Sequence, residues 1–246
     1  MDKYGLIGFP LKHSFSQQFF TNKFSVEGID ARYEKFEIPD ISQFSQIITE
    51  NPALRGLNVT IPYKEKVIAY LDGLDAKAEE IGAVNVIKFV RAEHGLKLIG
   101  YNSDVVGFSN SIAPLLQSYH KKALILGTGG ASKAVKRGLL DLGIESVYVS
   151  RTAREGILSY QDLSEDVIDE FTVIVNSTPL GTFPEVDAAA DIPYHLLTTK
   201  HLLYDLVYNP EETKFLRLGK EYGATVKNGY EMLELQALAA WEIWNG

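Results

Sequence analysis

Apolar runs and helical periodicity alternate in the second half of the chain. A short apolar run at 122–126 is followed by a glycine turn and then by a helical pattern over 131–142. Gly143 lies where a helix C-cap glycine belongs, and residues 146–150 form the next β-rich run, so the segment predicts a strand-helix-strand unit of about 30 residues. Further strands, with helical stretches between some of them, are expected at 173–175, 202–204 and 224–226. This alternation predicts a parallel, doubly wound sheet.

The first half carries its own α/β pattern, and its sheet is expected to be partly parallel. Strands are expected at 4–7, 33–38, 57–60, 84–90 and 96–100. Helical patterns lie at 15–27, 41–49 and 64–71. A further helix over 104–119 is expected to cross between the halves, and an apolar helix over 231–244 is expected to close the chain.

The chain length allows two domains, because 246 residues exceed one ordinary α/β domain of roughly 100 to 150 residues. We therefore predict a two-domain α/β protein. The N-terminal α/β domain covers residues 1–103, and the closing helix at 231–246 returns to it. A Rossmann-like, doubly wound domain covers residues 104–230.

The composition is that of a globular protein with a sizeable core, because 46% of the residues are hydrophobic and 23% are charged. No apolar run approaches the roughly 18 residues that a membrane helix needs, and the N-terminus lacks the basic and apolar regions of a signal peptide. The sequence thus predicts a cytoplasmic protein with no membrane partner.

Several kinds of chemistry are disfavoured by residue usage. The chain has no cysteine, and its five histidines show no metal-ligand spacing, so neither a disulfide nor a metal site is expected. A net charge of -8 without a basic block argues against nucleic-acid binding. An anionic ligand must therefore be held by local features, such as helix N-termini and a few well-placed cations.

The glycine turn has the context of a dinucleotide-binding site, since it joins an expected strand to an expected helix. Gly127 permits the tight turn, and Gly129, followed by Gly130 and Ala131, lets backbone N–H groups approach a pyrophosphate at the helix N-terminus. Ser132 stands at the third fingerprint position, where the usual pattern has glycine. The alternative is a glycine-rich turn without a ligand.

The tip of the next strand carries two cations, Arg151 and Arg154, beside Ser150 and Thr152. NAD-binding folds place a carboxylate there to accept the ribose 2′-hydroxyl, whereas arginine accommodates the 2′-phosphate of NADP. No carboxylate occupies this tip, and guanidinium groups suit bidentate phosphate contacts, so NADP is favoured over NAD. The alternative is that both arginines are solvated loop charges.

A second loop follows the expected strand at 173–175, at the side of an open sheet where ligands bind. Backbone between Asn176 and Thr182, including Thr178, could cover a nicotinamide ring. The alternative is an ordinary Pro-Gly turn.

Lys64 lies two residues after Pro62, which suits the first position of a helix. A lysine in the first helical turn faces the positive end of the helix dipole, which disfavours its charged form and predicts a lowered pKa. Such a group could exchange a proton near neutral pH. The alternative is a lysine side chain that extends into solvent.

Other polar positions allow two interpretations each. Asp104 follows a strand and starts a helix, so it is either a helix cap or a carboxylate that accepts a substrate hydroxyl and pairs with an ammonium group. Ser14 and Ser16 are either hydroxyl donors to a substrate carboxylate or the N-cap region of the next helix.

Read together and in order, segments from nearly the whole chain resemble the shikimate dehydrogenase family. No single motif is decisive, and the resemblance rests on the order and spacing of all of them. The segments are His13–Ser16, Asn58–Lys64, Gly82–Asn85, Asn102–Asp104, Gly127–Ala134, Asn176–Thr182 and Asn228–Gln236.

The resemblance implies a substrate domain and a Rossmann-like NADP domain with a cleft between them. Lys64 and Asp104 would be the catalytic pair, and both would contact the substrate. The other substrate-binding residues would be Ser14 and Ser16 for a carboxylate, Thr60, Asn85 and Gln236 for ring hydroxyls, and Tyr208 from the cofactor domain. Cofactor-binding residues would be Gly127, Gly129, Gly130, Ala131, Ser150, Arg151, Thr152, Arg154, Thr178 and Gly229.

By the same resemblance the chain would be an oxidoreductase that reversibly reduces 3-dehydroshikimate to shikimate, a step of chorismate and aromatic amino-acid biosynthesis. NADPH would deliver a hydride to the C3 carbonyl, while Lys64 stabilises or protonates the developing alkoxide and Asp104 orients it. The partners would be small molecules, and the protein would be a monomer or a homodimer.

The chain departs from the family pattern at three places. Gln17 replaces the proline that usually follows the second serine, Ser150 replaces the asparagine that commonly precedes the arginine, and the region after Arg154 is shortened. These changes affect the start of the first helix, the adenosine contacts and peripheral helices, and leave the catalytic pair in place.

Two other functions stay open at this point. A quinate or dual quinate/shikimate dehydrogenase would use the same scaffold and catalytic pair. The resemblance favours shikimate, because in the family a bulkier substrate often accompanies changes at the positions of Ser14 and Ser16. A ligand sensor without catalysis would need neither Lys64 nor Asp104, so the presence of both argues against it.

Overall fold

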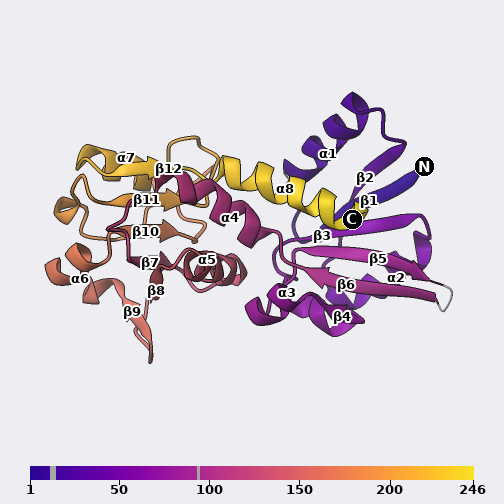
Figure 1. The fold of residues 1–246 in the computed structure, drawn as a ribbon, viewed down its shortest axis with the longest axis horizontal. Coiled ribbons are helices and arrows are strands. Elements are labelled where there is room, and N and C mark those ends of the chain that lie inside the picture. The colour runs from indigo at the N-terminus through magenta and orange to yellow at the C-terminus, as the bar shows by residue number, and fades with distance from the viewer. Residues whose placement is uncertain (12–14, 93–94) are drawn as a thin grey trace. The chain divides into compact units, whose positions relative to one another are not determined.

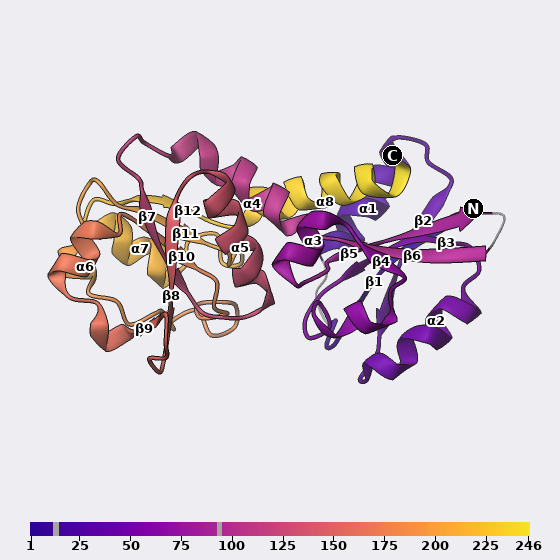
Figure 2. The same ribbon diagram turned by 60° about the horizontal axis from the view of Figure 1, so that its bottom comes forward.

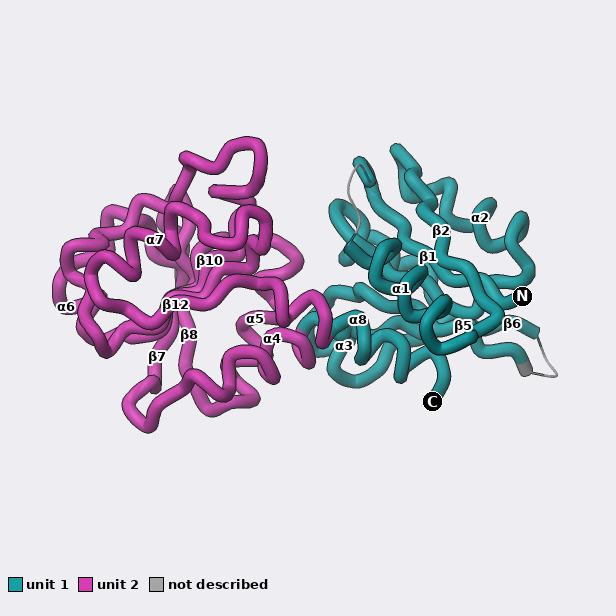
Figure 3. The backbone as a smooth tube through the Cα atoms, turned by 90° about the horizontal axis from the view of Figure 1, so that it is seen from above, with its two compact units in different colours: residues 1–104, 236–246 teal, residues 105–235 magenta. Residues whose placement is uncertain are grey.

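The computed structural model describes residues 1–11, 15–92 and 95–246. The chain forms two compact units, one made of residues 1–104 and 236–246 and the other of residues 105–235 (Figure 3). The predicted α/β class is confirmed for both units. The ligands predicted for the two domains, and the cleft expected between them, stay predictions.

The first unit is built on a mixed six-stranded sheet with the order β2-β1-β3-β5-β6-β4 (Figure 1). Its strands are β1 (Asp2–Gly8), β2 (Ala31–Glu37), β3 (Leu54–Val59), β4 (Gly73–Leu74), β5 (Val86–Ala92) and β6 (Gly95–Tyr101). Strand β1 runs parallel to β2 and β3, whereas β5 is antiparallel to β3 and β6. The expected partly parallel sheet is thus confirmed.

Helices cover both faces of this sheet (Figure 2). They are α1 (Phe15–Val26), the 3-10 helix η1 (Ile41–Gln43), α2 (Phe44–Glu50), the 3-10 helix η2 (Lys66–Tyr70) and α3 (Ala76–Ile81). One core lies under α2 and η2, where Phe44 and Val67 are buried. The other core joins Phe20 of α1 to Trp244, near the end of helix α8 (Tyr230–Asn245).

The prediction of a helix over residues 64–71 is wrong. Turns occupy residues 61, 62, 64 and 65, and a 3-10 helix begins only at Lys66. Helix α3 was missed, although it has clear end signals: Asp75 caps its N-terminus, and Gly82 ends it with a left-handed φ of 67°.

The second unit is built on a parallel six-stranded sheet with the order β12-β11-β10-β7-β8-β9. Its strands are β7 (Lys122–Leu126), β8 (Glu145–Ser150), β9 (Ile157–Ser159), β10 (Val173–Asn176), β11 (Leu202–Asp205) and β12 (Thr225–Lys227). This order is that of a doubly wound Rossmann sheet, as predicted. Strands β8 and β9 follow on one side of β7, whereas β10, β11 and β12 follow on its other side. The carboxyl ends of β7 and β10 therefore form the topological switch point where such folds bind ligands.

Both faces of this sheet are buried, and successive side chains along each strand point to opposite faces. Leu124, Leu126 and Ile174 contribute to one core, whereas Ile125 and Val175 contribute to the other. Figure 2 shows the covering helices on opposite sides of the strands. They are α4 (Asp104–Ile112), η3 (Ala113–Leu115), α5 (Gly130–Asp141), η4 (Tyr160–Asp162), α6 (Glu165–Glu170), η5 (Tyr194–Leu196) and α7 (Lys214–Glu221).

The predicted helix over 104–119 is shorter than expected. Helix α4 ends at Ile112, a 3-10 turn that contains Pro114 follows, and the chain is extended at Leu116. Within the part of the chain that the structure describes, no helix is long and apolar enough to cross a bilayer.

Candidate active site

Lys64 and Asp104 form a nearly buried ion pair in the first unit. The Lys64 Nζ lies 2.5 Å from Asp104 Oδ2, and the side chains are only 15% and 9% exposed. The main chain holds Lys64 in place, because its carbonyl oxygen accepts a hydrogen bond from Val84 N at 2.8 Å. Removing two charges from water is costly, so such a pair is weak evidence for stability and stronger evidence for a site.

Asn85 holds the other oxygen of this carboxylate. Its Nδ2 donates to Asp104 Oδ1 at 2.8 Å, and its Oδ1 accepts from Ser103 N at 2.7 Å. Asn85 and Asp104 are 3% and 6% exposed. The Asp104 carboxylate is thus fixed between an ammonium and an amide. This geometry agrees with the interpretation of Asp104 as the partner of an ammonium group and not as a helix cap alone.

The helix-dipole argument for Lys64 is wrong, because Lys64 precedes a 3-10 helix and lies in no α-helical turn. The special environment of the lysine comes instead from a carboxylate 40 residues further along the chain.

A chain of buried polar groups continues from this pair. Tyr33 donates its hydroxyl to Asn58 Oδ1 at 2.7 Å, and Asn58 Nδ2 donates to the Asn85 carbonyl at 3.3 Å. Tyr33 also forms a hydrogen bond with Ser16, which opposes the burial that raises the pKa of Tyr33 well above its ordinary value. Tyr33 was not expected from sequence, since nothing in its local pattern distinguishes it from a core tyrosine.

Of the other residues predicted to bind substrate, Gln236 contacts this network. Ser103 Oγ donates to Gln236 Oε1 at 3.4 Å. Thr60 is half-buried, and its backbone N–H donates to the Ile7 carbonyl at 2.9 Å. Ser14 lies outside the described residues.

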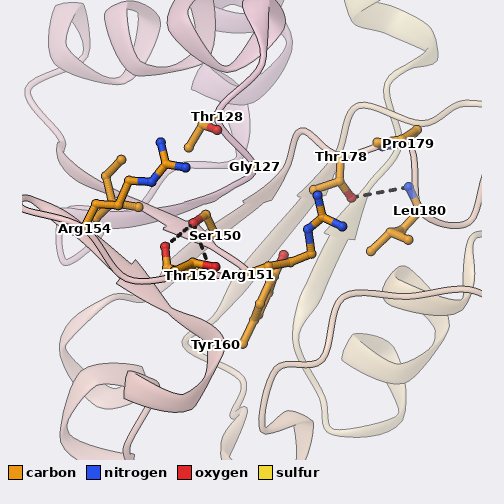
Figure 4. A pocket seen from close by; sticks show the side chains of 11 residues that line it. Gly127, Thr128, Ser150, Arg151, Thr152, Arg154, Tyr160, Thr178, Pro179 and Leu180 are labelled. Atoms are coloured by element: carbon orange, nitrogen blue, oxygen red, sulfur yellow. Dashed lines mark hydrogen bonds between the residues drawn. The ribbon is translucent and has the colours of Figure 1, made fainter.

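A pocket of about 690 Å³ lies in the second unit, at the switch point of its sheet (Figure 4). Predicted cofactor residues Gly127, Ser150, Arg151, Thr152, Arg154 and Thr178 line it, together with Thr128, Ile157, Tyr160, Pro179 and Leu180. The predicted residues Gly129, Gly130, Ala131 and Gly229 are not among the residues that line this pocket.

The glycine turn provides a backbone cradle. Gly127 has a φ of +99°, and a Cβ atom there would lie 2.9 Å from Thr178 Cγ2, so glycine is required. Gly129 is the N-cap of the twelve-residue helix α5, and a Cβ at Gly129 would meet no atom within 4 Å. This open approach to a helix N-terminus suits an anionic group. Ser132, at the third fingerprint position, is buried and donates to the Gly129 carbonyl at 2.6 Å.

Two guanidinium groups border the pocket. Figure 4 shows Arg154 directed toward Thr128 and Arg151 directed toward Thr178. Burial raises the pKa of Tyr160, and the nearby Arg151 opposes this shift. Among the described residues that line the pocket, none carries a carboxylate. The arrangement fits a phosphate-bearing ligand.

Gly229 and Tyr208 are not among the residues that line this pocket. Gly229 packs on the main chain of Leu206, where a Cβ atom would lie 2.2 Å from the Leu206 oxygen. Tyr208 is half-buried, and burial raises its pKa. The contact of Gly229 with Leu206 requires glycine for packing, whatever its role toward a ligand.

Comparisons with known proteins point in one direction. Residues 6–87 match the family model described as the shikimate dehydrogenase substrate binding domain. A shikimate dehydrogenase (NADP(+)) of Aquifex aeolicus is 39% identical over 256 residues, which cover 99% of this chain and 91% of the relative.

Solved structures agree with this match. The structure of shikimate 5-dehydrogenase from Thermus thermophilus, in complex with NADP(H) and shikimate, has a TM-score of 0.86 and 30% identity, with 100% of this chain and 94% of that chain covered. A quinate dehydrogenase from Corynebacterium glutamicum, in complex with NAD, also has a TM-score of 0.86, at 25% identity and with the same coverage of 100% and 94%.

Proposed function

The chain belongs to the shikimate dehydrogenase family, and on this premise we propose that it reversibly reduces 3-dehydroshikimate to shikimate with NADPH. The observation that carries the proposal is the Lys64, Asp104 and Asn85 arrangement, in which a cation and a carboxylate are held together with little exposure to solvent. A sensor that only binds a ligand would have no need of this pair.

The residues of the second unit fit NADP. The open Gly129 at the start of α5 would receive the pyrophosphate, and Arg151 and Arg154 would bind the 2′-phosphate through charge-assisted hydrogen bonds. When bound, NADPH supplies the hydride that reduces a carbonyl group. Thr178 and Gly229 would support the other half of the dinucleotide.

The catalytic roles follow from the ion pair. Lys64 would stabilise the developing alkoxide and hold or deliver its proton, because an ammonium in a desolvated site interacts strongly with a nascent oxyanion. Asp104 would orient the ammonium group and would accept a hydrogen bond from a substrate hydroxyl. Asn85 would fix the carboxylate through its amide group.

The remaining substrate contacts are assigned by chemistry. Ser14 and Ser16 would donate hydroxyl groups to the substrate carboxylate. Thr60 and Gln236, together with Asn85, would bind the ring hydroxyls, and Tyr208 would reach the substrate from the second unit. We further propose that the protein works as a monomer or homodimer in the cytoplasm.

One assay tests the proposed function. Oxidation of shikimate and of quinate is followed with NADP and with NAD through the absorbance of the reduced nicotinamide, using the purified full chain. Turnover of shikimate with NADP, well above the rate with quinate, supports the proposal. Preference for quinate indicates the quinate dehydrogenase alternative, and binding of shikimate without any turnover indicates a sensor.

A further inference from the structure

Asp205 is a fully buried carboxylate at the carboxyl end of β11, with 0% exposure. It accepts three hydrogen bonds from three segments. Asn176 Nδ2 at the end of β10 donates to Oδ1 at 2.9 Å, Val207 N donates to the same oxygen at 3.0 Å, and Thr213 Oγ1 donates to Oδ2 at 2.6 Å. One side chain therefore joins the ends of two neighbouring strands to the segment before α7.

Asn176 carries this connection to the pocket. Its Oδ1 accepts from Thr178 N at 3.1 Å and from Thr178 Oγ1 at 2.6 Å, and the Thr178 hydroxyl accepts from Leu180 N at 3.3 Å. Thr178 and Leu180 both line the pocket. The conformation of the loop after β10 is thus set by an amide that is itself held by Asp205.

Folding alone gives little reason for a carboxylate at this position. Burial raises the pKa of Asp205 to about 6, against hydrogen bonds from Thr213, Val207 and Asn176 that lower it, so desolvation outweighs the contacts. A buried charge is generally less stabilising than a well-packed neutral group of similar size. Three directed hydrogen bonds instead fix geometry at strand ends, which is where open parallel sheets bind ligands.

The two halves of a dinucleotide bind on opposite sides of the switch point. The two arginines follow β8, on one side, whereas Asp205 and Asn176 end β11 and β10, on the other side. Val207 lies next to Tyr208, the tyrosine assigned to the substrate. Asp205 thus belongs to the half of the site that would receive the nicotinamide.

We propose that Asp205 is a positioning residue that fixes the Thr178 loop and the turn before Tyr208, so that the nicotinamide half of NADP is held in one reactive orientation. This inference rests on the proposed function. It assigns Asp205 no contact with cofactor or substrate.

The test compares two ligands that share one half. Adenosine 2′,5′-bisphosphate carries the adenosine and the 2′-phosphate, whereas NADP adds the nicotinamide half. In the full chain, Asp205→Ala should weaken NADP binding measured by calorimetry and lower kcat on the order of 10²-fold, because small displacements of reacting groups are that costly. Its affinity for adenosine 2′,5′-bisphosphate should fall less than its affinity for NADP, because Thr178 and Leu180 line the pocket that the arginines border, whereas NADP also depends on the turn before Tyr208.

Conservative variants separate positioning from charge and from stability. Asp205→Asn can still accept from Asn176 and Val207 and can donate to Thr213, so it should recover most of the lost kcat and NADP affinity. Thr213→Val removes one hydrogen bond from an intact carboxylate and should give a smaller effect of the same kind. Ile168→Ala, which empties a buried site on α6 and removes no hydrogen bond of this network, is the control for lost stability.

The outcomes are distinct. The inference is overturned if Asp205→Ala binds NADP and turns over like the parent, or if Ile168→Ala at a similar melting temperature shows the same selective loss of NADP affinity. It is equally overturned if Asp205→Ala weakens the binding of both ligands by the same factor. Failure of the proposed function is a different result, because the parent itself would then not oxidise shikimate with NADP.

Discussion

The Lys64 ammonium lies 2.5 Å from a carboxylate oxygen of Asp104, with both side chains shielded from most solvent. The contact joins the turn after β3 to the first residue of α4, so two segments that are distant in the sequence build it. An ion pair in this setting holds the ammonium group in one direction, which is what stabilisation of an alkoxide requires.

Loss of the Lys64 ammonium should therefore affect chemistry more than folding. Lys64→Ala should lower kcat by a factor on the order of 10² to 10⁴, the usual contribution of one acid-base group, while NADP affinity stays near that of the parent. Steady-state kinetics with saturating shikimate measure this, and Lys66→Ala, two residues away in η2, is the matched control. Near-parental kcat in Lys64→Ala would remove Lys64 from the catalytic pair.

Asp104→Asn tests whether the carboxylate acts together with the lysine. The variant keeps the shape and the bond from Asn85 but removes the charge that faces Lys64, so kcat should fall strongly. If the two residues act as a unit, Lys64→Ala with Asp104→Asn should be little worse than the more damaging single variant. Multiplicative losses in this double-mutant cycle would show independent roles.

Arg151 should discriminate between the two nicotinamide cofactors. Arg151→Ala should raise the KM for NADP by roughly 10- to 100-fold and change the KM for NAD little, because only the 2′-phosphate loses a hydrogen bond to a charged group worth about 1.5–3 kcal/mol. Arg137→Ala is the matched control, since Arg137 pairs with Asp141 on α5. An equal rise in both KM values would contradict the phosphate-binding role.

The central strands of the second unit could be predicted from sequence because they are buried on both faces. Strand β7 is apolar from Ala123 to Leu126, and such a run between turn signals has few other interpretations. Strands β4 and β9 were missed, since two or three residues are too few to show a period.

Local signals misled the prediction around Lys64. Pro62 and the apolar residues Val67, Ile68 and Leu71 have helical spacing, yet only a 3-10 helix over Lys66–Tyr70 forms. Helix α3 has six residues, which is shorter than the window over which helical periodicity is measured.

The contacts of the candidate site could not be predicted from local pattern, because they join distant residues. Lys64 and Asp104 are 40 positions apart, and Asn176 and Asp205 are 29 apart. Only resemblance to a family brought the first pair together, and nothing in the local sequence distinguished Asp205 from an exposed aspartate at a strand end.

Gly56 should be required for packing of the C-terminal helix. A Cβ atom on Gly56 would lie 2.2 Å from Trp244 Nε1, whose N–H donates to the Ile87 carbonyl at 3.1 Å. Gly56→Ala should destabilise the fold by about 1–3 kcal/mol, the usual range for overpacking. Urea unfolding measures this, and Gly73→Ala, whose Cβ would lie 3.5 Å from its nearest neighbour, is the control expected to be mild.

Asp205 should make stability depend on pH in an unusual direction for a carboxyl group. Burial raises its folded pKa to about 6 from an ordinary 3.8, so the folded state binds the proton more tightly than the unfolded state. Its stabilising contribution is then complete below pH 3.8 and is lost as the pH rises through about 6. The shift corresponds to a loss on the order of 3 kcal/mol.

Urea unfolding of the parent and of Asp205→Asn, which cannot titrate, isolates this contribution from other groups. The unfolding free energy of the parent, relative to Asp205→Asn, should fall between pH 4.5 and pH 6.5 by about 1–3 kcal/mol and change little at higher pH. Thr213→Val removes a hydrogen bond that lowers the Asp205 pKa, so the same fall should extend to higher pH. If the unfolding free energy of the parent relative to Asp205→Asn stays constant or rises between these pH values, the pKa of the buried carboxyl lies below this pH range.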